Sequence, residues 1–155
     1  MKYLIILLSL SCGLYAGSST CLDLAANLER GVQTIASGRI DDGLMEISEE
    51  GVGSESPKQK AERNKKFSDL LKRLGDFGAT RRVVRVSLLY IGEGYCRLRV
   101  LDRRNNGAVL WTFFCERDGD RWYLTSVAAT ANGDFSTLMK ELDAADYSKE
   151  EQKAP

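Results

Sequence analysis

The segment 81–128 most constrains the fold, because it consists of four strand-like runs joined by three turns. The runs are rich in Val, Leu, Tyr, Phe, Trp and Thr, which favour β-strands. Glycine-containing turns separate them at residues 92–94, 105–107 and 118–119. Short connections make consecutive strands antiparallel neighbours, so the sequence predicts a four-stranded meander.

The turn positions also predict which side chains share a face of this sheet, because a slip of one residue would invert every side chain. A turn centred on residues 105 and 106 pairs Cys96 with Cys115, Leu98 with Phe113, and Val100 with Trp111. A two-residue turn at 118–119 would add the pairs Cys115 with Trp122 and Phe113 with Leu124. A loop around Gly94 would place Tyr90, Leu88 and Val86 opposite Cys96, Leu98 and Val100. The three turns together predict one continuous apolar face.

The opposite face is mixed and carries more apolar residues than a fully solvated face. We interpret it as the interface of a homodimer. Its members are Arg85, Ser87, Arg97, Arg99, Thr112 and Thr125, with Leu89, Ile91, Tyr95, Leu101, Leu110, Phe114 and Tyr123.

Helices are predicted before and after the sheet. Thr20 can cap a helix with an apolar stripe, Gly38 ends it, and Ile40, Leu44 and Ile47 repeat the helical spacing. Pro57 begins a third helix that runs to Leu74, of which only the second half is apolar, and its basic residues are predicted to form a solvated face. Apolar residues between 135 and 142 predict a short C-terminal helix. The predicted class is therefore α+β, with N-terminal helices packed on a curved four-stranded antiparallel meander.

The N-terminus predicts export. Residues 1–16 combine a basic start, a short apolar core and small residues ending at Ala16, which is typical of a secretory signal peptide. The apolar core is too short for a membrane span, so none is expected in the mature chain. We expect a secreted or periplasmic domain over 17–146 and a loose tail over 147–155. The alternative is a lipoprotein anchored at Cys12, although Leu10 weakens the match.

Composition excludes several classes of partner and cofactor. Lys plus Arg equals Asp plus Glu, at 22 each in 155 residues, so no net charge recruits nucleic acid or an anionic membrane. The chain has no His and no Cys-x-x-Cys motif, which argues against a histidine-ligated metal and a redox pair. We expect no metal and no cofactor.

Export favours disulfide formation among the three cysteines that follow the leader. Cys96 and Cys115 face each other in the predicted register, and their pairing is the preferred prediction. The alternatives are a bond from Cys21 to one of the strand cysteines, or three packed free thiols.

The order of these elements carries a resemblance to a known superfamily. A helix is followed by 37–45 (SGRIDDGLM), then by a helix ending in Arg73-Leu74-Gly75, then by a meander closing with 118–122 (DGDRW). Over roughly residues 22–128 the chain resembles small secreted bacterial members of the nuclear transport factor 2-like (cystatin-like cone) superfamily. The resemblance implies a cone-shaped sheet around helices, frequent dimerisation through the sheet, and a cavity between the layers.

Two classes of function fit that implied cavity. An isomerase- or cyclase-like enzyme would need a general base and an oxyanion donor, and the candidates are Asp102, Arg82 and Tyr90, with Ser126 as a second hydroxyl. A salt bridge between Asp102 and Arg82 at the sheet rim accounts for both residues more simply. We therefore prefer a noncatalytic binding or accessory domain of the cell envelope, with an apolar small ligand in the cavity. Its lining would be Leu98, Val100, Trp111, Phe113, Trp122 and Leu124.

Overall fold

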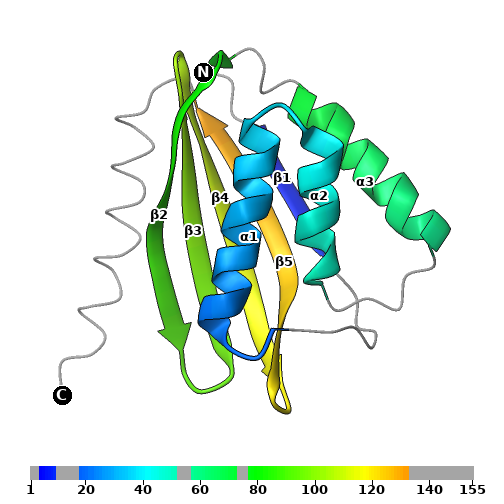
Figure 1. Ribbon diagram of the computed structural model, residues 1–155, viewed down its shortest axis with the longest axis vertical. Helices are drawn as coiled ribbons and strands as arrows, with labels where there is room; N and C mark the ends of the chain where they lie inside the picture. Colours follow the sequence, from blue (N-terminus) through cyan, green and yellow to red (C-terminus); the bar gives the residue numbers. More distant parts are fainter. Residues whose placement is uncertain (1–3, 10–17, 52–56, 73–76, 133–155) are drawn as a thin grey trace.

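A computed structural model of the protein describes residues 4–9, 18–51, 57–72 and 77–132. Its sheet contains β1 (Leu4–Ser9), β2 (Thr80–Ile91), β3 (Tyr95–Arg104), β4 (Gly107–Asp118) and β5 (Arg121–Asn132). All neighbours are antiparallel in the order β1-β5-β4-β3-β2. The helices α1 (Cys21–Ala36), α2 (Ile40–Glu49) and α3 (Pro57–Leu71) precede the meander, and α1 and α2 lie across one face of the sheet (Figure 1). The predicted α+β class is confirmed, whereas the predicted C-terminal helix and tail lie outside the described residues.

β1 adds a strand that the sequence did not predict. Residues 4–9, expected to form the core of the leader, pair with the edge of β5 from Leu4 opposite Ala131 to Ser9 opposite Ser126. The remainder of that edge is bridged by Ser18, which exchanges backbone hydrogen bonds with Trp122, and by Glu50, whose carbonyl accepts from the Leu124 amide. An edge strand exposes a row of unpaired backbone groups, and an apolar extended segment satisfies them. Cleavage of the leader remains a prediction.

The register between β3 and β4 agrees with the prediction. Cys96 faces Cys115, Leu98 faces Phe113, and Val100 faces Trp111. In β2, the predicted pairs of Tyr90 with Cys96 and Leu88 with Leu98 are also present.

Val86 is an exception, because the register shifts between Arg85 and Ser87. The predicted pair of Val86 with Val100 is therefore wrong, and Arg85 faces Val100 instead. A bulge inserts one residue into a strand and re-aims its side chains. Val86 accordingly lies 36% exposed rather than in the core.

The register between β4 and β5 also differs from the prediction. Asp118 pairs with Arg121, so residues 119 and 120 form the turn, and Gly119 has a φ of 58° that favours glycine. Cys115 therefore faces Leu124, not Trp122, and Phe113 faces Val127, not Leu124.

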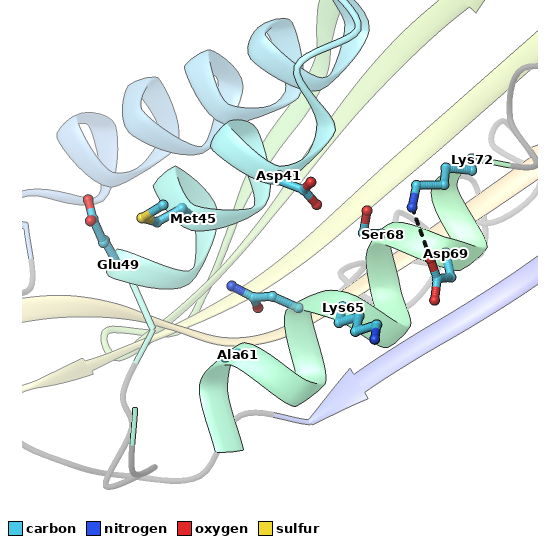
Figure 2. A pocket seen from close by; sticks show the side chains of 9 residues that line it. Asp41, Met45, Glu49, Ala61, Lys65, Ser68, Asp69 and Lys72 are labelled. Carbon is cyan, nitrogen blue, oxygen red and sulfur yellow. Dashed lines mark hydrogen bonds and ion pairs between the residues drawn. The ribbon is translucent and has the colours of Figure 1, made fainter. Parts of the chain in front are cut away.

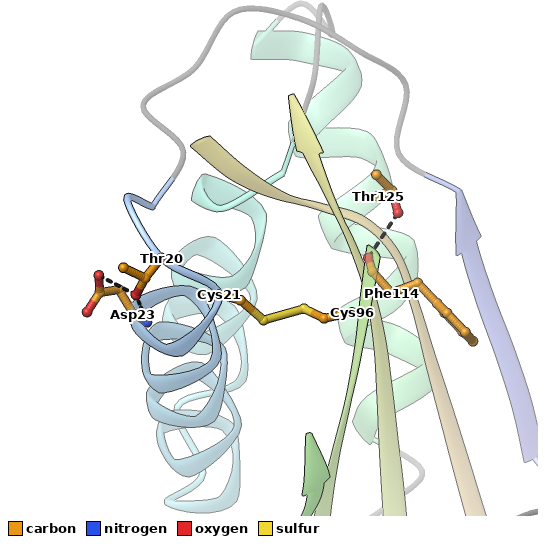
Figure 3. The surroundings of a disulfide bond; sticks show 6 residues. All are labelled: Thr20, Cys21, Asp23, Cys96, Phe114 and Thr125. Atoms are coloured by element: carbon orange, nitrogen blue, oxygen red, sulfur yellow. Dashed lines mark hydrogen bonds between the residues drawn. A yellow bond between two sulfur atoms is a disulfide. The ribbon is translucent and has the colours of Figure 1, made fainter. Parts of the chain in front are cut away.

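A bulge at Thr125 changes which residues of β5 face the core beyond that point. The register changes between Phe114 and Cys115, and the Thr125 hydroxyl donates a 2.9 Å hydrogen bond to the Phe114 carbonyl (Figure 3). Trp122 and Leu124 on one side of the bulge, and Val127 on the other, all remain buried against the helices. The apolar face is continuous as predicted, but through different pairs.

The first two helices begin, end and pack as their sequences indicate. The Thr20 hydroxyl accepts from the Asp23 amide at 3.0 Å, and Gly38, with a φ of 93°, follows the end of α1. α1 and α2 approach closely where glycines meet. A Cβ on Gly31 would lie 2.5 Å from Ile47 Cγ1, and a Cβ on Gly43 would lie 2.5 Å from the Gly31 carbonyl oxygen. This contact requires the absence of a side chain on both glycines.

α3 is docked through its second half, as predicted. Lys58 and Glu62 are exposed, whereas Phe67 and Leu71 are buried in the core. The Phe67 ring packs edge-on against Trp111 with 6.3 Å between ring centroids. This contact ties α3 to the centre of the sheet.

The outer face of the sheet divides into two parts. Leu101, Ala108 and Leu110 form a second buried cluster with Val84. At the end of the sheet near the turn at 92–94, four large apolar side chains are exposed by 37 to 54%. We call these the outer-face patch: Leu89, Ile91, Tyr95 and Phe114.

Candidate binding site

The six side chains predicted to line a cavity belong to the main hydrophobic core. Trp122 is 8% exposed, and the other five are fully buried with apolar residues of α1, α2 and α3. Trp111 and Phe113 stack with 6.3 Å between ring centroids and 8° between ring planes. Neither of the two pockets that the structure describes is lined by any of the six. In the described part of the chain, these residues therefore stabilise the fold.

Asp102, the predicted acid or base, is a buried residue with partners on both carboxylate oxygens. Thr80 Oγ1 donates to Oδ1 at 2.8 Å, and Arg104 donates to Oδ2 from Nε at 2.8 Å and from Nη2 at 2.7 Å. Asp102 is 0% exposed, and the Arg104 side chain is 10% exposed. The carboxylate is thus neutralised by two N–H groups of one guanidinium, both on Oδ2, and a buried charge requires such a paired partner.

The predicted salt bridge to Arg82 is wrong. A register shift between Thr80 and Arg82 sets Arg82 opposite Arg103, and Val83 opposite Asp102. Arg82 is exposed. The partner is Arg104, which shares a face with Asp102 because residues two apart on a strand project to the same side. That spacing was visible in the sequence.

The other candidate catalytic residues lie elsewhere. Tyr90 sits at the opposite end of β2 from the strand positions that flank Asp102, is 53% exposed, and packs edge-on against Trp122. The bulge at Thr125 places Ser126 opposite Phe114 of the outer-face patch, not on the core-facing side. The structure therefore does not bring Asp102, Arg82 and Tyr90 together.

A small pocket of about 420 Å³ lies beside the Asp102 cluster. Thr80 and Arg104 contribute to its wall, with Lys72 and the end of α1 at Ser37 and Gly38. Asp102 does not line it. Thr80 and Arg104 in the wall of this pocket therefore already donate hydrogen bonds to Asp102.

The larger pocket is a cleft of about 620 Å³ between α2 and α3 (Figure 2). We call it the α2–α3 cleft. One wall is a stripe on α2 with a spacing of four residues, formed by Asp41, Met45 and Glu49. The other wall is the facing stripe of α3, formed by Ala61, Asn64, Lys65, Ser68, Asp69 and Lys72.

The walls of the α2–α3 cleft differ in charge. Asp41 and Glu49 make the α2 wall acidic, while Lys65 and Lys72 stand on α3. Lys72 Nζ lies 3.0 Å from Asp69 Oδ1. This hydrogen bond, together with the charges of Asp69 and Asp41, raises the pKa of Lys72 above its usual value.

The α2–α3 cleft was not predicted from the sequence. The basic residues of α3 are predicted to form a solvated face. Lys65 is indeed exposed, but it faces the cleft. The available signal was the recurrence of Asp41, Met45 and Glu49 every four residues, on a different side of α2 from the buried Leu44 and Ile47.

The disulfide corrects the preferred cysteine pairing. Cys96 is bonded to Cys21 (Figure 3). Cys115 is a buried free thiol. Burial raises the pKa of Cys115 to about 12, with a smaller contribution from the charge of Glu50. Cys96 and Cys115 do face each other as predicted, but Cys21 at the start of α1 takes the bond, as in the alternative prediction.

Two further properties bear on the site. Among the described residues, no cluster of three or more Cys, Asp or Glu side chains is arranged to hold a metal ion. No helix in the described ranges is both long and apolar enough to cross a membrane.

Comparisons with known proteins give one structural similarity. No protein-family model matches the chain, and no curated protein matches it. The chain is similar to a crystal structure from Campylobacter jejuni described as a "Putative NTF2-like transpeptidase", with a TM-score of 0.46 and 16% sequence identity over 68% of this chain and 97% of the other. At a TM-score below 0.5, this similarity assigns neither a family nor an activity to the chain.

Proposed function

We propose that the chain is an exported, noncatalytic binding or accessory domain of the cell envelope, built on the cone fold of the nuclear transport factor 2-like superfamily. The order of helices followed by an antiparallel meander supports that fold. The observation that carries the noncatalytic assignment is the engagement of both Asp102 carboxylate oxygens by Thr80 and Arg104. The alternative, an isomerase- or cyclase-like enzyme, would need Asp102 free to exchange a proton with a ligand, and Asp102 lines neither described pocket.

Export is supported by the leader-like residues 1–16 and by the disulfide between Cys21 and Cys96. The test is expression of the full chain in a bacterium with a periplasm, followed by fractionation and intact-mass analysis. A periplasmic product that begins at Gly17 would support the proposal. A lipid-modified Cys12 in the membrane fraction would establish the anchored alternative, and an unprocessed Met1 in the cytoplasm would contradict export.

The noncatalytic assignment is tested by stability rather than by an unknown activity. A structural role for Asp102 predicts that Asp102→Asn lowers the free energy of unfolding, because the buried Arg104 guanidinium loses its counter-ion. A residue held for catalysis commonly carries a cost to stability, so a stabilising Asp102→Asn substitution would favour the enzyme alternative.

Self-association through the sheet is part of the proposal. The outer-face patch gathers Leu89, Ile91, Tyr95 and Phe114 at one end of the sheet, with Arg97 beside them. Exposed apolar side chains that lie together commonly mark an interaction surface. Sedimentation equilibrium should show a dimer that Phe114→Ser weakens. A wild-type monomer at high concentration would remove the dimer from the proposal.

A further inference from the structure

The α2–α3 cleft has two walls of complementary chemistry. We propose that it binds a short extended peptide that presents basic side chains to α2 and backbone carbonyls to α3. This inference deepens the proposed function, because it names a ligand class for a binding domain. It is carried by the juxtaposition of the Asp41, Met45 and Glu49 stripe with Lys65 and the buried Ser68 hydroxyl across one cleft (Figure 2).

The dimensions of the cleft match a few residues of extended chain. Asp41 and Glu49 are eight positions apart on α2, which corresponds to about 12 Å at 1.5 Å per residue. An extended peptide advances about 3.3 Å per residue, so side chains four positions apart are about 13 Å apart and project to the same side. The cleft volume of about 620 Å³ lies within the usual range for small-ligand sites.

The α2 wall suits basic side chains joined by an apolar spacer. Asp41 and Glu49 stand at its two ends, and within the described residues neither forms an ion pair with α3. Met45 lies between them and is 52% exposed. A thioether is flexible and polarisable, so it can pack against varied apolar groups. The wall therefore combines two separated carboxylates with an adaptable apolar contact.

The α3 wall supplies donors for peptide carbonyls. Lys65 is exposed at the cleft, and Lys72 is held by Asp69 at 3.0 Å. Asn64 belongs to the same wall, and its amide donates a long hydrogen bond of 3.4 Å to the Ser48 hydroxyl. An extended peptide meets this wall with acceptors, because its carbonyl groups project along its length.

Ser68 is the independent sign of a missing ligand. The residue is 2% exposed, its hydroxyl has no hydrogen-bond partner among the described residues, and it lies between the two helices in Figure 2. Buried polar groups are nearly always paired in folded proteins, so each unpaired one requires an explanation. A peptide carbonyl in the cleft would pair this hydroxyl, after a small movement of the surrounding side chains.

The experiment titrates the disulfide-bonded protein with defined peptides and follows backbone amide shifts by NMR. The probe is acetyl-KASAK-amide, whose two lysines match the spacing of Asp41 and Glu49. The inverted peptide acetyl-EASAE-amide should bind at least about tenfold more weakly, because its charges oppose the α2 wall. The short peptide acetyl-KSK-amide has the same charge, but its two lysines are only about 7 Å apart along the chain and match the spacing of the two carboxylates less well. It should therefore bind about fivefold more weakly, the size of one lost exposed charge pair.

Protein variants locate the site. Asp41→Asn and Glu49→Gln should each weaken KASAK binding about fivefold, and Ser68→Ala should weaken it without unfolding the protein. Asp42→Asn is the matched control, because Asp42 is an exposed acid of α2 that lies near Arg39 and does not line the cleft. This control should bind the probe like the wild type.

Three outcomes would overturn the inference: no binding of KASAK, equal binding of KASAK and EASAE, or binding that Asp42→Asn weakens as much as Glu49→Gln does. The proposed function is tested independently of the cleft proposal. A chain that is processed at Gly17 but ignores the peptide loses only the cleft proposal, whereas an unprocessed chain that binds KASAK loses only export.

Discussion

Cys21, at the first turn of α1, is covalently bonded to Cys96 near the start of β3. The bond closes a sequence separation of 75 residues and joins the helical layer to the sheet. It leaves Cys115, the residue that faces Cys96 across the hairpin, as a buried thiol. The helices and the sheet are therefore linked at this end both by packing and by a covalent bond.

Loss of the disulfide between Cys21 and Cys96 should destabilise the folded protein. Cys96→Ser should lower the free energy of unfolding by about 2–5 kcal/mol, because a cross-link over a long loop restricts the unfolded chain. Urea unfolding monitored by fluorescence measures the change. Cys115→Ser is the control for burying a hydroxyl on β4 and should leave the disulfide intact. Nonreducing peptide mapping that links Cys96 to Cys115 would contradict the assignment.

The free thiol predicts an alkaline loss of stability. The pKa of Cys115 is raised from 9.0 to about 12 in the folded protein. Its contribution to stability is therefore complete below about pH 9, and falls between pH 9 and pH 12 by up to about 1.4 kcal/mol per pH unit. Cys115→Ala should flatten the pH dependence of unfolding over this range. Equal slopes for the two proteins would show that the thiol does not titrate as expected.

The Asp102 cluster predicts a contrast between two arginines. Arg104→Ala should cost about 3–5 kcal/mol, because it leaves a buried carboxylate without its guanidinium. Arg82→Ala is the matched control on an exposed position and should change stability by less than about 0.5 kcal/mol. Both values come from urea unfolding at pH 7. Similar losses in the two variants would contradict the pairing of Asp102 with Arg104.

The contact between α1 and α2 predicts a contrast between two glycines. A Cβ on Gly43 would lie 2.5 Å from the Gly31 carbonyl oxygen and 2.8 Å from the Ile35 amide nitrogen, so the backbones must separate. Gly43→Ala should therefore cost about 2 kcal/mol or more. Gly94→Ala meets nothing within 4 Å and should be nearly neutral. Thermal unfolding distinguishes the two, and a neutral Gly43→Ala would refute the close packing.

The sequence predicted the sheet best where the turn chemistry was unambiguous. The loop around residues 105–107 set the β3–β4 register correctly, so Leu98 and Phe113 face each other. The β4–β5 register was not predicted, because the turn lies one residue later than expected and the bulge at Thr125 shifts the pairing again. The change at the turn moves the pairing by two residues and keeps the same side chains on the core side, whereas the bulge moves Ser126 off that side and Val127 onto it.

The candidate site was harder to predict than the fold. The prediction placed ligands between the sheet and the helices, but large side chains such as Trp111 fill that space. Whether apolar residues enclose a void depends on how closely two layers approach, and a hydrophobic pattern carries no such distance. The α2–α3 cleft depends on the relative placement of two helices, which the 3.6-residue period of each helix does not determine.

The pairing of β1 with β5 gives the predicted leader a second consequence. Residues 4–9 cover Ser126 to Ala131, whereas Ser18 and Glu50 bridge only the Trp122 and Leu124 end of that strand. Removal of residues 1–16 would therefore expose the backbone groups of β5 from Ser126 to Ala131, whereas those of Trp122 and Leu124 would stay hydrogen-bonded. Cleavage of the leader would thus control when the Ser126 to Ala131 edge becomes available: it is covered before cleavage, and afterwards it can pair with a strand of another chain.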